Sequence, residues 1–414
     1  MTSPSTAPTG PLAAIPPAGP HEAAKARLAA AVDAAREDIL ELSHRIHANP
    51  EPAFEEVQAA SWIATILRER GFDVEHPAGS LATAIRATKH GGRSGPGPRI
   101  GILAEYDALP GLGHGCGHNT MAASGVGAAI ALAALADELP GEIVFLGTPA
   151  EERGSGKKTM IEEGLFDGID AALLFHPCDR NHVESQPLAS EDVDVVFHGL
   201  QAHAAADPWR GRNALDAMIL LFSSVGLWRQ QLRTDARVHG IIQEGGTAAN
   251  IIPDRTRAWF MLRSPDQAYY AEMKARFGEL VDAAALATGT TADIAFSGGA
   301  MTMKQNRTLE ARWVANAEAY GIADQGPDPN SGSTDMGNVS WVCPTIHPEL
   351  AIAPEGTAGH SILFRDAAAT PAADATTLLA ATLVAQTSYE LFADPEVVAA
   401  AWRDFHAADE ADRD

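Results

Sequence analysis

Three short apolar runs recur in the first half of the chain, at residues 100–104, 143–147 and 171–175. Their apolar positions are consecutive rather than alternating, which is typical of strands buried on both faces of a parallel sheet. An alanine-rich helix is predicted at about 121–138, and a further helix is expected before the third run. This alternation of strand and helix favours an α/β fold, with a mixed, mostly parallel sheet covered by helices.

Helices are also predicted on both sides of these runs. One spans about 23–48 and ends where the Asn-Pro-Glu-Pro segment 49–52 prevents its continuation. A second spans about 55–70, and two more follow in the last quarter of the chain, at 308–320 and 372–392. These segments are expected to cover the sheet.

The pattern changes between the two sets of helices. Six elements follow in the order strand, helix, strand, strand, helix, strand, at 192–197, 212–232, 238–243, 256–263, 265–287 and 292–296. This order is that of a ferredoxin-like βαββαβ unit, which can form a domain alone. We therefore expect an inserted domain at 191–303, a catalytic metal-binding domain from 21–190 and 304–414, and a disordered tail at 1–20.

Composition narrows the range of partners. The 414 residues are 46% hydrophobic and 20% charged, as expected of a globular chain long enough for two domains. The 54 acidic against 30 basic residues, formally −24, argue against nucleic acid and anionic membranes as partners. No apolar run approaches the roughly 20 residues that span a bilayer, so no membrane segment is expected.

Two further features predict a cytoplasmic protein. The three cysteines are sparse and odd in number, which disfavours a disulfide framework and fits a reducing compartment. The first 20 residues are rich in Pro, Ala, Ser and Thr and lack the basic and apolar regions of a signal peptide.

Potential metal ligands follow each of the three apolar runs. Cys116 and His118 lie in a Gly-His-Gly-Cys-Gly-His turn after the first run, Glu151 and Glu152 follow the second, and His176 follows the third. Because parallel strands end at the same edge of a sheet, these side chains are expected to converge there. Thiolate and imidazole suit zinc, manganese or similar ions, so the spacing predicts a metal site.

Each candidate also has an ordinary explanation. Cys116 alone is a small buried hydrophobe, and the two glutamates alone are a solvated pair at a helix start. His176 alone caps a strand, and His360 alone is a surface-loop residue. At the end of a buried strand, however, neighbouring side chains diverge, so one glutamate can hold metal while the other faces water. Metal-dependent hydrolysis requires both roles, a metal ligand and a base that faces the water.

An ordered set of motifs carries a family resemblance. The chain resembles the metal-dependent aminoacylase and carboxypeptidase superfamily of amidohydrolases, in the branch of aminobenzoyl-glutamate hydrolases, auxin-conjugate hydrolases and related dipeptidases. The resemblance spans about 36–392. Many auxin-type members have Asp-x-His after the Cys-Gly-His turn, but Asn119-Thr120-Met121 follows here, as on the aminobenzoyl-glutamate and dipeptidase side. The matching segments are Ser43–Glu51, Tyr106–Pro110, Cys116–His118, Thr148–Glu152, His176–Pro177, His203–Ala214, Gly245–Pro253, Ser333–Asn338 and Ala358–His360.

The resemblance implies a centre of two divalent metal ions, zinc or manganese, with Cys116 as the bridge. Glu151 would be the general base, taking a proton from water and returning it to the leaving amine. Asp107 would not touch metal but would orient a ligand. The implied ligands are Cys116, His118, Glu152, His176 and His360.

The resemblance also implies residues outside the metal centre. His203 would reach the active site of the other subunit of a homodimer, joined through the inserted domain, and stabilise the oxyanion. Its alternative is a histidine that packs at an interface. Asn250 and Arg263 are expected to contact a substrate carboxylate, although Arg263 can equally pair with an internal acid.

Three classes of function stay open from the sequence. The leading one is hydrolysis of the amide bond of a small N-acyl or N-aroyl amino acid or dipeptide-like substrate. The alternative is metal-dependent deamination of an aromatic or amidino substrate, because the same activated water can displace ammonia. The third is a non-catalytic binding protein, which the presence of Glu151 beside every expected ligand disfavours. A thiol hydrolase built on Cys116 fits poorly, because the nearby carboxylates and imidazoles suit a metal better.

Overall fold

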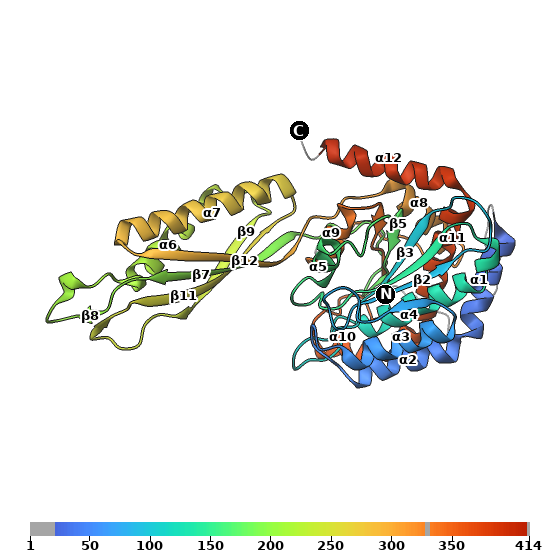
Figure 1. Ribbon diagram of the computed structural model, residues 1–414, viewed down its shortest axis with the longest axis horizontal. Helices are drawn as coiled ribbons and strands as arrows, with labels where there is room; N and C mark the ends of the chain where they lie inside the picture. The colour runs from blue at the N-terminus through green and yellow to red at the C-terminus, as the bar shows by residue number, and fades with distance from the viewer. Residues whose placement is uncertain (1–20, 328–331, 412–414) are drawn as a thin grey trace, which may run out of the picture.

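The computed structural model describes residues 21–327 and 332–411, which form two lobes (Figure 1). In the larger lobe of this described part, a six-stranded sheet has the order β1-β2-β4-β3-β5-β13. β3 pairs in parallel with β4 and β5, and β13 pairs in parallel with β5, whereas β1 and β2 are antiparallel. The expected mixed, mostly parallel sheet is confirmed. Its strands are β1 (Asp73–Glu75), β2 (Ile85–His90), β3 (Arg99–Ala104), β4 (Glu142–Gly147), β5 (Ala171–Leu173) and β13 (Thr345–Ile346).

Helices pack on both sides of this sheet and bury its apolar runs. The alanine-rich helix α4 is buried along nearly its whole length, between β3 and the helices α2 and α11. Its small side chains permit this close packing, because a larger residue would displace a neighbouring helix. The helices of the larger lobe are α1 (Glu22–Ala34), α2 (Arg36–Ala48), α3 (Val57–Glu69), α4 (His118–Ala133), α5 (Gly156–Glu162), α8 (Arg307–Glu318), α9 (Met336–Ser340), α10 (Ile362–Ala367), α11 (Pro371–Ala393) and α12 (Pro395–Ala411).

Two of the predicted helices differ from those observed. The helix expected over 23–48 is two helices, α1 and α2, which meet at Ala35. This segment contains no Gly or Pro to mark the break, and the break lets α1 bury Leu28 while α2 buries Ile39 against α4 and α11. The helix expected over 121–138 begins earlier, at His118, and gives way to a short 3-10 helix, η1 (Ala136–Glu138).

The smaller lobe is an antiparallel sheet with the order β12-β7-β11-β9, covered on one face by two helices (Figure 1). A hydrophobic cluster of its own, which includes Phe197, Phe260 and Phe277, fills the space between sheet and helices. The limits of an inserted domain at 191 and 303 stay a prediction. The elements are β7 (Ala189–His198), α6 (Ala214–Trp228), β9 (Arg237–Glu244), β11 (Arg255–Ser264), α7 (Gln267–Thr288) and β12 (Thr291–Ala300), with 3-10 helices η2 (Pro208–Arg210) and η3 (Arg229–Gln231).

Two short strand pairs complete the described structure. β8 (Ala202–His203) pairs with β10 (Ile251–Ile252), and in Figure 1 β8 lies at the end of the smaller lobe that is distant from the larger one. β6 (His176–Cys178) pairs in parallel with β14 (Glu349–Ala351), directly after β5.

The tail predicted at 1–20 lies outside the described residues. Among the helices that are described, none combines the length and the apolar character needed to cross a bilayer.

Candidate active site

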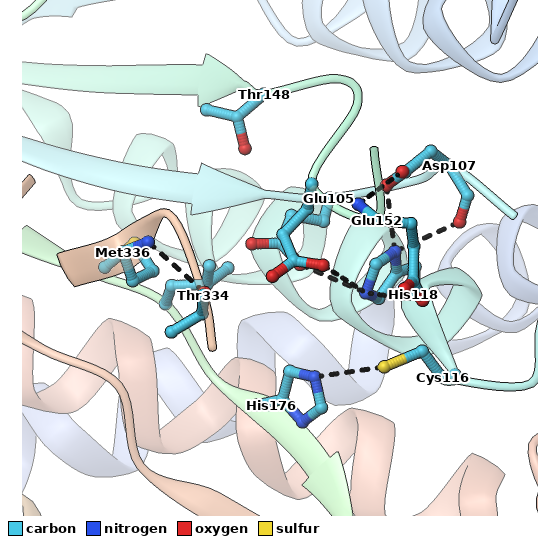
Figure 2. Close-up of polar contacts among 12 residues, drawn as sticks. Glu105, Asp107, Cys116, His118, Thr148, Glu152, His176, Thr334 and Met336 are labelled. Atoms are coloured by element: carbon cyan, nitrogen blue, oxygen red, sulfur yellow. Dashed lines mark hydrogen bonds and ion pairs between the residues drawn. The ribbon is translucent and has the colours of Figure 1, made fainter. Parts of the chain in front are cut away.

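The carboxyl ends of three neighbouring strands carry most of the candidate site. Asp107 follows β3, Glu151 and Glu152 follow β4, and His176 opens β6 directly after β5. Because β3, β4 and β5 are parallel neighbours, these residues lie at one edge of the sheet, as Figure 2 shows for Asp107, Glu152 and His176. This is the convergence that the three apolar runs predicted.

The glycine-rich turn places Cys116 and His118 at the same edge. Gly117, between them, has a φ of 79°, and a Cβ there would lie 2.7 Å from Pro177. Glycine therefore permits both the left-handed backbone and the close approach to the segment that follows His176. The loop before α10 joins this turn, because the His360 N–H donates a hydrogen bond to the Gly115 carbonyl at 3.0 Å.

Asp107 fixes the orientation of two candidate ligands. The His118 Nδ1 lies 3.0 Å from both the carbonyl oxygen and the Oδ1 of Asp107. Both partners are acceptors, so Nδ1 carries the proton and Nε2 is left to face the site. The second oxygen of Asp107 accepts the Glu152 N–H at 3.0 Å. This geometry agrees with a residue that orients ligands.

Among the described residues, two groups of potential ligands share Cys116. One is Cys116, His118 and His176, and the other is Cys116, Glu152 and His360, each with its ligand atoms within 4.8 Å of one another. The Cys116 Sγ lies 3.5 Å from the His176 Nε2, and the His360 Nε2 lies 3.5 Å from a Glu152 oxygen. Two ligands at the bond lengths of zinc, in tetrahedral geometry, stand about 3.4–3.6 Å apart. These spacings therefore fit shared ions.

The hydrogen bonding and protonation of these side chains bear on metal binding. Burial opposes a charge on His118, but Cys116 and Asp107 raise its pKa, so an ion has to displace a proton from this ring. The Glu152 Oε1 is buried and lacks a hydrogen-bond partner in the described structure, which is costly unless an ion satisfies it. The buried His118 Nε2 makes no hydrogen bond there either, although a Glu105 oxygen lies 3.2 Å away. Burial lowers the pKa of His176 to about 3, so its imidazole is neutral, as a metal ligand must be. Burial raises the pKa of the Cys116 thiol, so metal binding has to displace a proton there.

Glu151 lies outside both groups that share Cys116, but with Glu105 and His118 it forms a third group of potential ligands, whose ligand atoms also lie within 4.8 Å of one another. One of its oxygens is 4.0 Å from the His118 Nε2. Burial raises its pKa, with further contributions from the negative charges of Glu105 and Glu152. The turn before it is held in an uncommon conformation, since Ala150 has a φ of 62° and its N–H donates to a Glu56 oxygen at 2.8 Å. A raised pKa next to candidate ligands is what a general base requires.

A buried ionic cluster behind the site did not emerge from the sequence. The Lys157 Nζ lies 2.5 Å from a Glu105 oxygen and 2.5 Å from an Asp335 oxygen, and all three side chains are almost wholly buried. The other oxygen of Glu105 is 3.2 Å from the His118 Nε2 (Figure 2). Glu105 follows a buried apolar run, as Glu151 does, so the same sequence signal could have found it. Lys157 and Asp335 carry no such signal.

A further histidine near the candidate ligands was also not predicted from the sequence. His347 is buried, and its Nδ1 lies 3.1 Å from the Leu174 carbonyl oxygen. Its ring centroid is 5.3 Å from that of His176. Burial lowers the pKa of His347 to about 4, so the residue is a neutral neighbour of the candidate ligands.

A cavity of about 570 Å³ separates the ligands from the smaller lobe. Its walls include Cys116, Glu151 and His360 from the larger lobe, and Asp192 and Arg263 from the open face of the smaller lobe's sheet. The structure thus brings Arg263 to the cavity. Its Nε is buried and lacks a hydrogen-bond partner in the described part of the chain.

His203 and Asn250 lie elsewhere. His203 belongs to β8, and the Asn250 carbonyl accepts the Ala204 N–H at 3.0 Å, so the two residues share the distant end of the smaller lobe (Figure 1). Neither lines the cavity. The His203 Nδ1 accepts backbone N–H groups from Ala205 and Ala206, at 3.2 and 3.1 Å. Within one chain, these two predicted site residues are not brought to the metal ligands.

Comparison with known proteins identifies the family. The model of the peptidase family M20/M25/M40 matches residues 101–381. The Xaa-Arg dipeptidase of Mus musculus is 37% identical over 93% of this chain and 92% of its own length. A p-aminobenzoyl-glutamate hydrolase chain of Escherichia coli is 33% identical over 68% of this chain and 62% of its own length.

A solved structure supports the fold. A dinuclear metal-binding peptidase of the M20 family from Bacillus subtilis superposes with a TM-score of 0.63 at 22% identity, over 84% of this chain and 98% of that one. The chain belongs to the peptidase family M20/M25/M40. The predicted superfamily is confirmed, and with it the class of enzyme, a metal-dependent hydrolase of amide bonds.

Proposed function

We propose that the protein uses two divalent ions, zinc or manganese, to hydrolyse the amide bond of an N-acyl or N-aroyl amino acid or a dipeptide-like substrate. The observation that carries this proposal is the pair of ligand groups that share Cys116 beside Glu151. The names of the similar dipeptidase and aminobenzoyl-glutamate hydrolase support amide hydrolysis over the alternative of deamination.

The side chains of the site have different proposed roles in the reaction. Bound ions supply Lewis acidity for the attacking water and the scissile carbonyl. Cys116, His118, Glu152, His176 and His360 would hold them, with Cys116 as the bridge.

Glu151 accepts a proton from the water and delivers it to the leaving amine, a role to which its raised pKa is suited. Asp107 keeps the Nδ1 of His118 protonated and so directs Nε2 to the metal. Arg263 is the proposed partner of the substrate carboxylate, which a guanidinium binds bidentately.

We further propose a homodimer in which His203 and Asn250 complete the site of the partner subunit. Their distance from the cavity of their own chain supports this arrangement. The smaller lobe also offers surface for an interface, because β9 is an edge strand and nearby apolar side chains are exposed. These exposed side chains are Ile219, Leu220 and Leu227 on α6 and Ile241 and Ile242 on β9.

A cytoplasmic location is part of the proposal. Cys116, Cys178 and Cys343 are all free in the structure, which suits a reducing compartment.

Elemental analysis and product identification test this function together. The metal-loaded protein is incubated with N-acyl amino acids, aminobenzoyl-glutamate, dipeptides and aromatic amines, and the products are identified by mass. We expect up to two ions per chain, a free amino acid as product, and loss of activity with a chelator. Protein that neither binds nor responds to zinc or manganese would contradict the proposal, and release of ammonia would favour the deaminase alternative.

A further inference from the structure

The backbone on each side of Glu151 donates a hydrogen bond to a buried carboxylate. The Ala150 N–H donates to a Glu56 oxygen at 2.8 Å, and the Glu152 N–H donates to an Asp107 oxygen at 3.0 Å. Because Glu151 lies between these two N–H groups, its backbone is held from both directions. The sequence and the proposed reaction give Asp107 a role, but they give none to Glu56.

The side chain of Glu56 does not serve its own helix. Glu56 occupies the N-cap position of α3, yet its carboxylate makes no capping hydrogen bond there. The N–H groups of Gln58 and Ala59 donate instead to the carboxylate of Glu51, at 2.9–3.0 Å. The Glu56 carboxylate is therefore available to the loop that follows β4.

The Glu56 carboxylate is wholly buried, and both of its oxygens are hydrogen-bonded. One oxygen accepts the N–H groups of Phe54 and Ala150, at 2.9 and 2.8 Å. The other accepts the hydroxyl of Thr83 at 2.7 Å. Burial raises the pKa of Glu56 to about 7, so an ionised group is costly at this position. Three donors at ordinary hydrogen-bond distances fix where the carboxylate lies.

The turn that leads into Glu151 has an unfavourable backbone conformation. Ala150 has a φ of 62°, in the left-handed region that residues with a side chain seldom adopt. Such a conformation persists only where the surroundings impose it. The N–H of this same residue is the donor to Glu56, so the hydrogen bond acts at the point where the chain direction is set.

The segment that contains Glu56 also contacts the far end of the same loop. Gly154 has a φ of 123°, and a Cβ there would lie 2.4 Å from a ring carbon of Phe54. Phe54 in turn donates its own N–H to Glu56. Residues 54–56 thus contact the loop 150–154 at its beginning and at its end, with the two glutamates of the site between these contacts.

We propose that Glu56 is a positioning residue for Glu151: its carboxylate fixes the Ala150 peptide and with it the direction in which the general base enters the site. This inference rests on the proposed function, in which Glu151 accepts a proton from the attacking water. A general base works only within hydrogen-bond reach of that water, and a displacement of about 1 Å can cost about 10²-fold in rate. Glu56 does not line the cavity, so it acts through Glu151.

Two substitutions separate the length of the Glu56 side chain from its charge. Glu56→Asp keeps the charge but is shorter by one methylene group, which withdraws the carboxylate from the Ala150 N–H. Glu56→Gln keeps the length, and its amide oxygen can accept both N–H groups while its NH2 group donates to the Thr83 hydroxyl. The metal-loaded full-length proteins are assayed with Ala-Arg and with aminobenzoyl-glutamate, and kcat, KM, metal content and the unfolding midpoint in urea are measured.

The two variants should differ in kcat. For Glu56→Asp we expect kcat to fall by about 10- to 100-fold, because the base is displaced, with KM and metal content within about twofold of the wild type. Glu56→Gln should keep kcat within about threefold, because the hydrogen bond to Ala150 is retained. A purely structural role would lower the unfolding midpoint of Glu56→Asp without changing kcat per metal-loaded site.

Two controls test whether the effect passes through Glu151. In a Glu151→Gln background, adding Glu56→Asp should lower kcat by less than about twofold, because the base that it positions is already gone. Glu51→Ala removes the carboxylate that caps α3. It should lower the unfolding midpoint but leave kcat unchanged.

Several outcomes would overturn the inference and leave the proposed function intact. One is an unchanged kcat in Glu56→Asp, and another is a loss of kcat that is equally large in the Glu151→Gln background. Loss of metal from Glu56→Asp would mean that Glu56 supports the ligands rather than the base. If Glu56→Gln loses kcat by 10-fold or more, as expected for a displaced base, the charge of Glu56 matters rather than its hydrogen bond, whether or not Glu56→Asp folds. If the metal-loaded wild type cleaves neither amide, the proposed function itself is wrong.

Discussion

The two lobes hold their functional residues in opposite ways. In the larger lobe, His118 and Asp107 are wholly buried and hydrogen-bonded to each other, and the ligand groups come together within one chain. In the smaller lobe, His203 and Asn250 are exposed at one end, and Arg263 lies on an open sheet face. Under the proposed function, the residues of one chain would hold the metal, whereas His203 and Asn250 would reach a site only in a partner subunit.

Sheet topology explains the contrast. Parallel strands end at a common edge, so the loops after β3, β4 and β5 deliver their side chains to one point. An antiparallel sheet has no such edge, and its side chains are spread over a face. In the smaller lobe, the candidate residues are therefore spread over a sheet face and do not converge at one point.

The largest expected effect separates catalysis from metal binding inside the larger lobe. Glu151→Gln should lower kcat by about 10²- to 10⁴-fold, because it removes the proposed general base, while metal content stays near that of the wild type. Glu152→Gln removes a candidate ligand and should lower metal content itself. Elemental analysis and steady-state kinetics on both variants check this, and equal metal content with equal residual activity would mean that the two roles are wrongly assigned.

The next effect is on stability and compares two neighbouring lysines. Lys157→Met leaves Glu105 and Asp335 buried without their cation, so we expect a loss of about 3–5 kcal/mol in the free energy of unfolding. Lys158→Met is the control, since Lys158 is partly exposed and donates to the Gly298 carbonyl at 2.9 Å. It should cost less than about 1.5 kcal/mol. Urea unfolding measures both, and similar losses would show that the buried cluster adds nothing.

Subunit mixing tests whether the smaller lobe serves its partner. His203→Ala should lower kcat by about 10²- to 10³-fold if the residue stabilises an oxyanion. When Glu151→Gln and His203→Ala subunits are dissociated and reassociated together, half of the dimers are mixed, and a shared site makes one of their two sites whole. About a quarter of wild-type activity should then return. No recovery would show that His203 acts on its own chain.

The smallest effect concerns acid stability of the larger lobe in the metal-free protein. Burial lowers the pKa of His347 to about 4, against about 6.5 in the unfolded chain, so the unfolded state binds more protons between these values. Stability should therefore fall as pH decreases from about 6.5 to about 4. His347→Gln should reduce the slope of unfolding free energy against pH by about one proton in this window. An unchanged slope would show that His347 is not held neutral.

Local sequence patterns were enough to predict the sheet edge and the residues placed on it. Strand runs and the ligands that follow them are local features, so Cys116, His118, Glu152 and His176 could be assigned to one edge from the order of residues alone. The order of strands and helices in the smaller lobe was predictable for the same reason. The sequence motifs also predicted the family, and the comparisons confirm that prediction.

Tertiary structure alone decided which distant residues meet. The pairing of Lys157 with Glu105 and Asp335 joins segments 52 and 178 residues apart, and no local pattern encodes it. The break at Ala35 depends on packing against α4 and α11 rather than on a helix-breaking residue. The placement of Asp192 and Arg263 on the same face arises from strand register, because a shift of either strand by one residue would turn its own side chain to the other face.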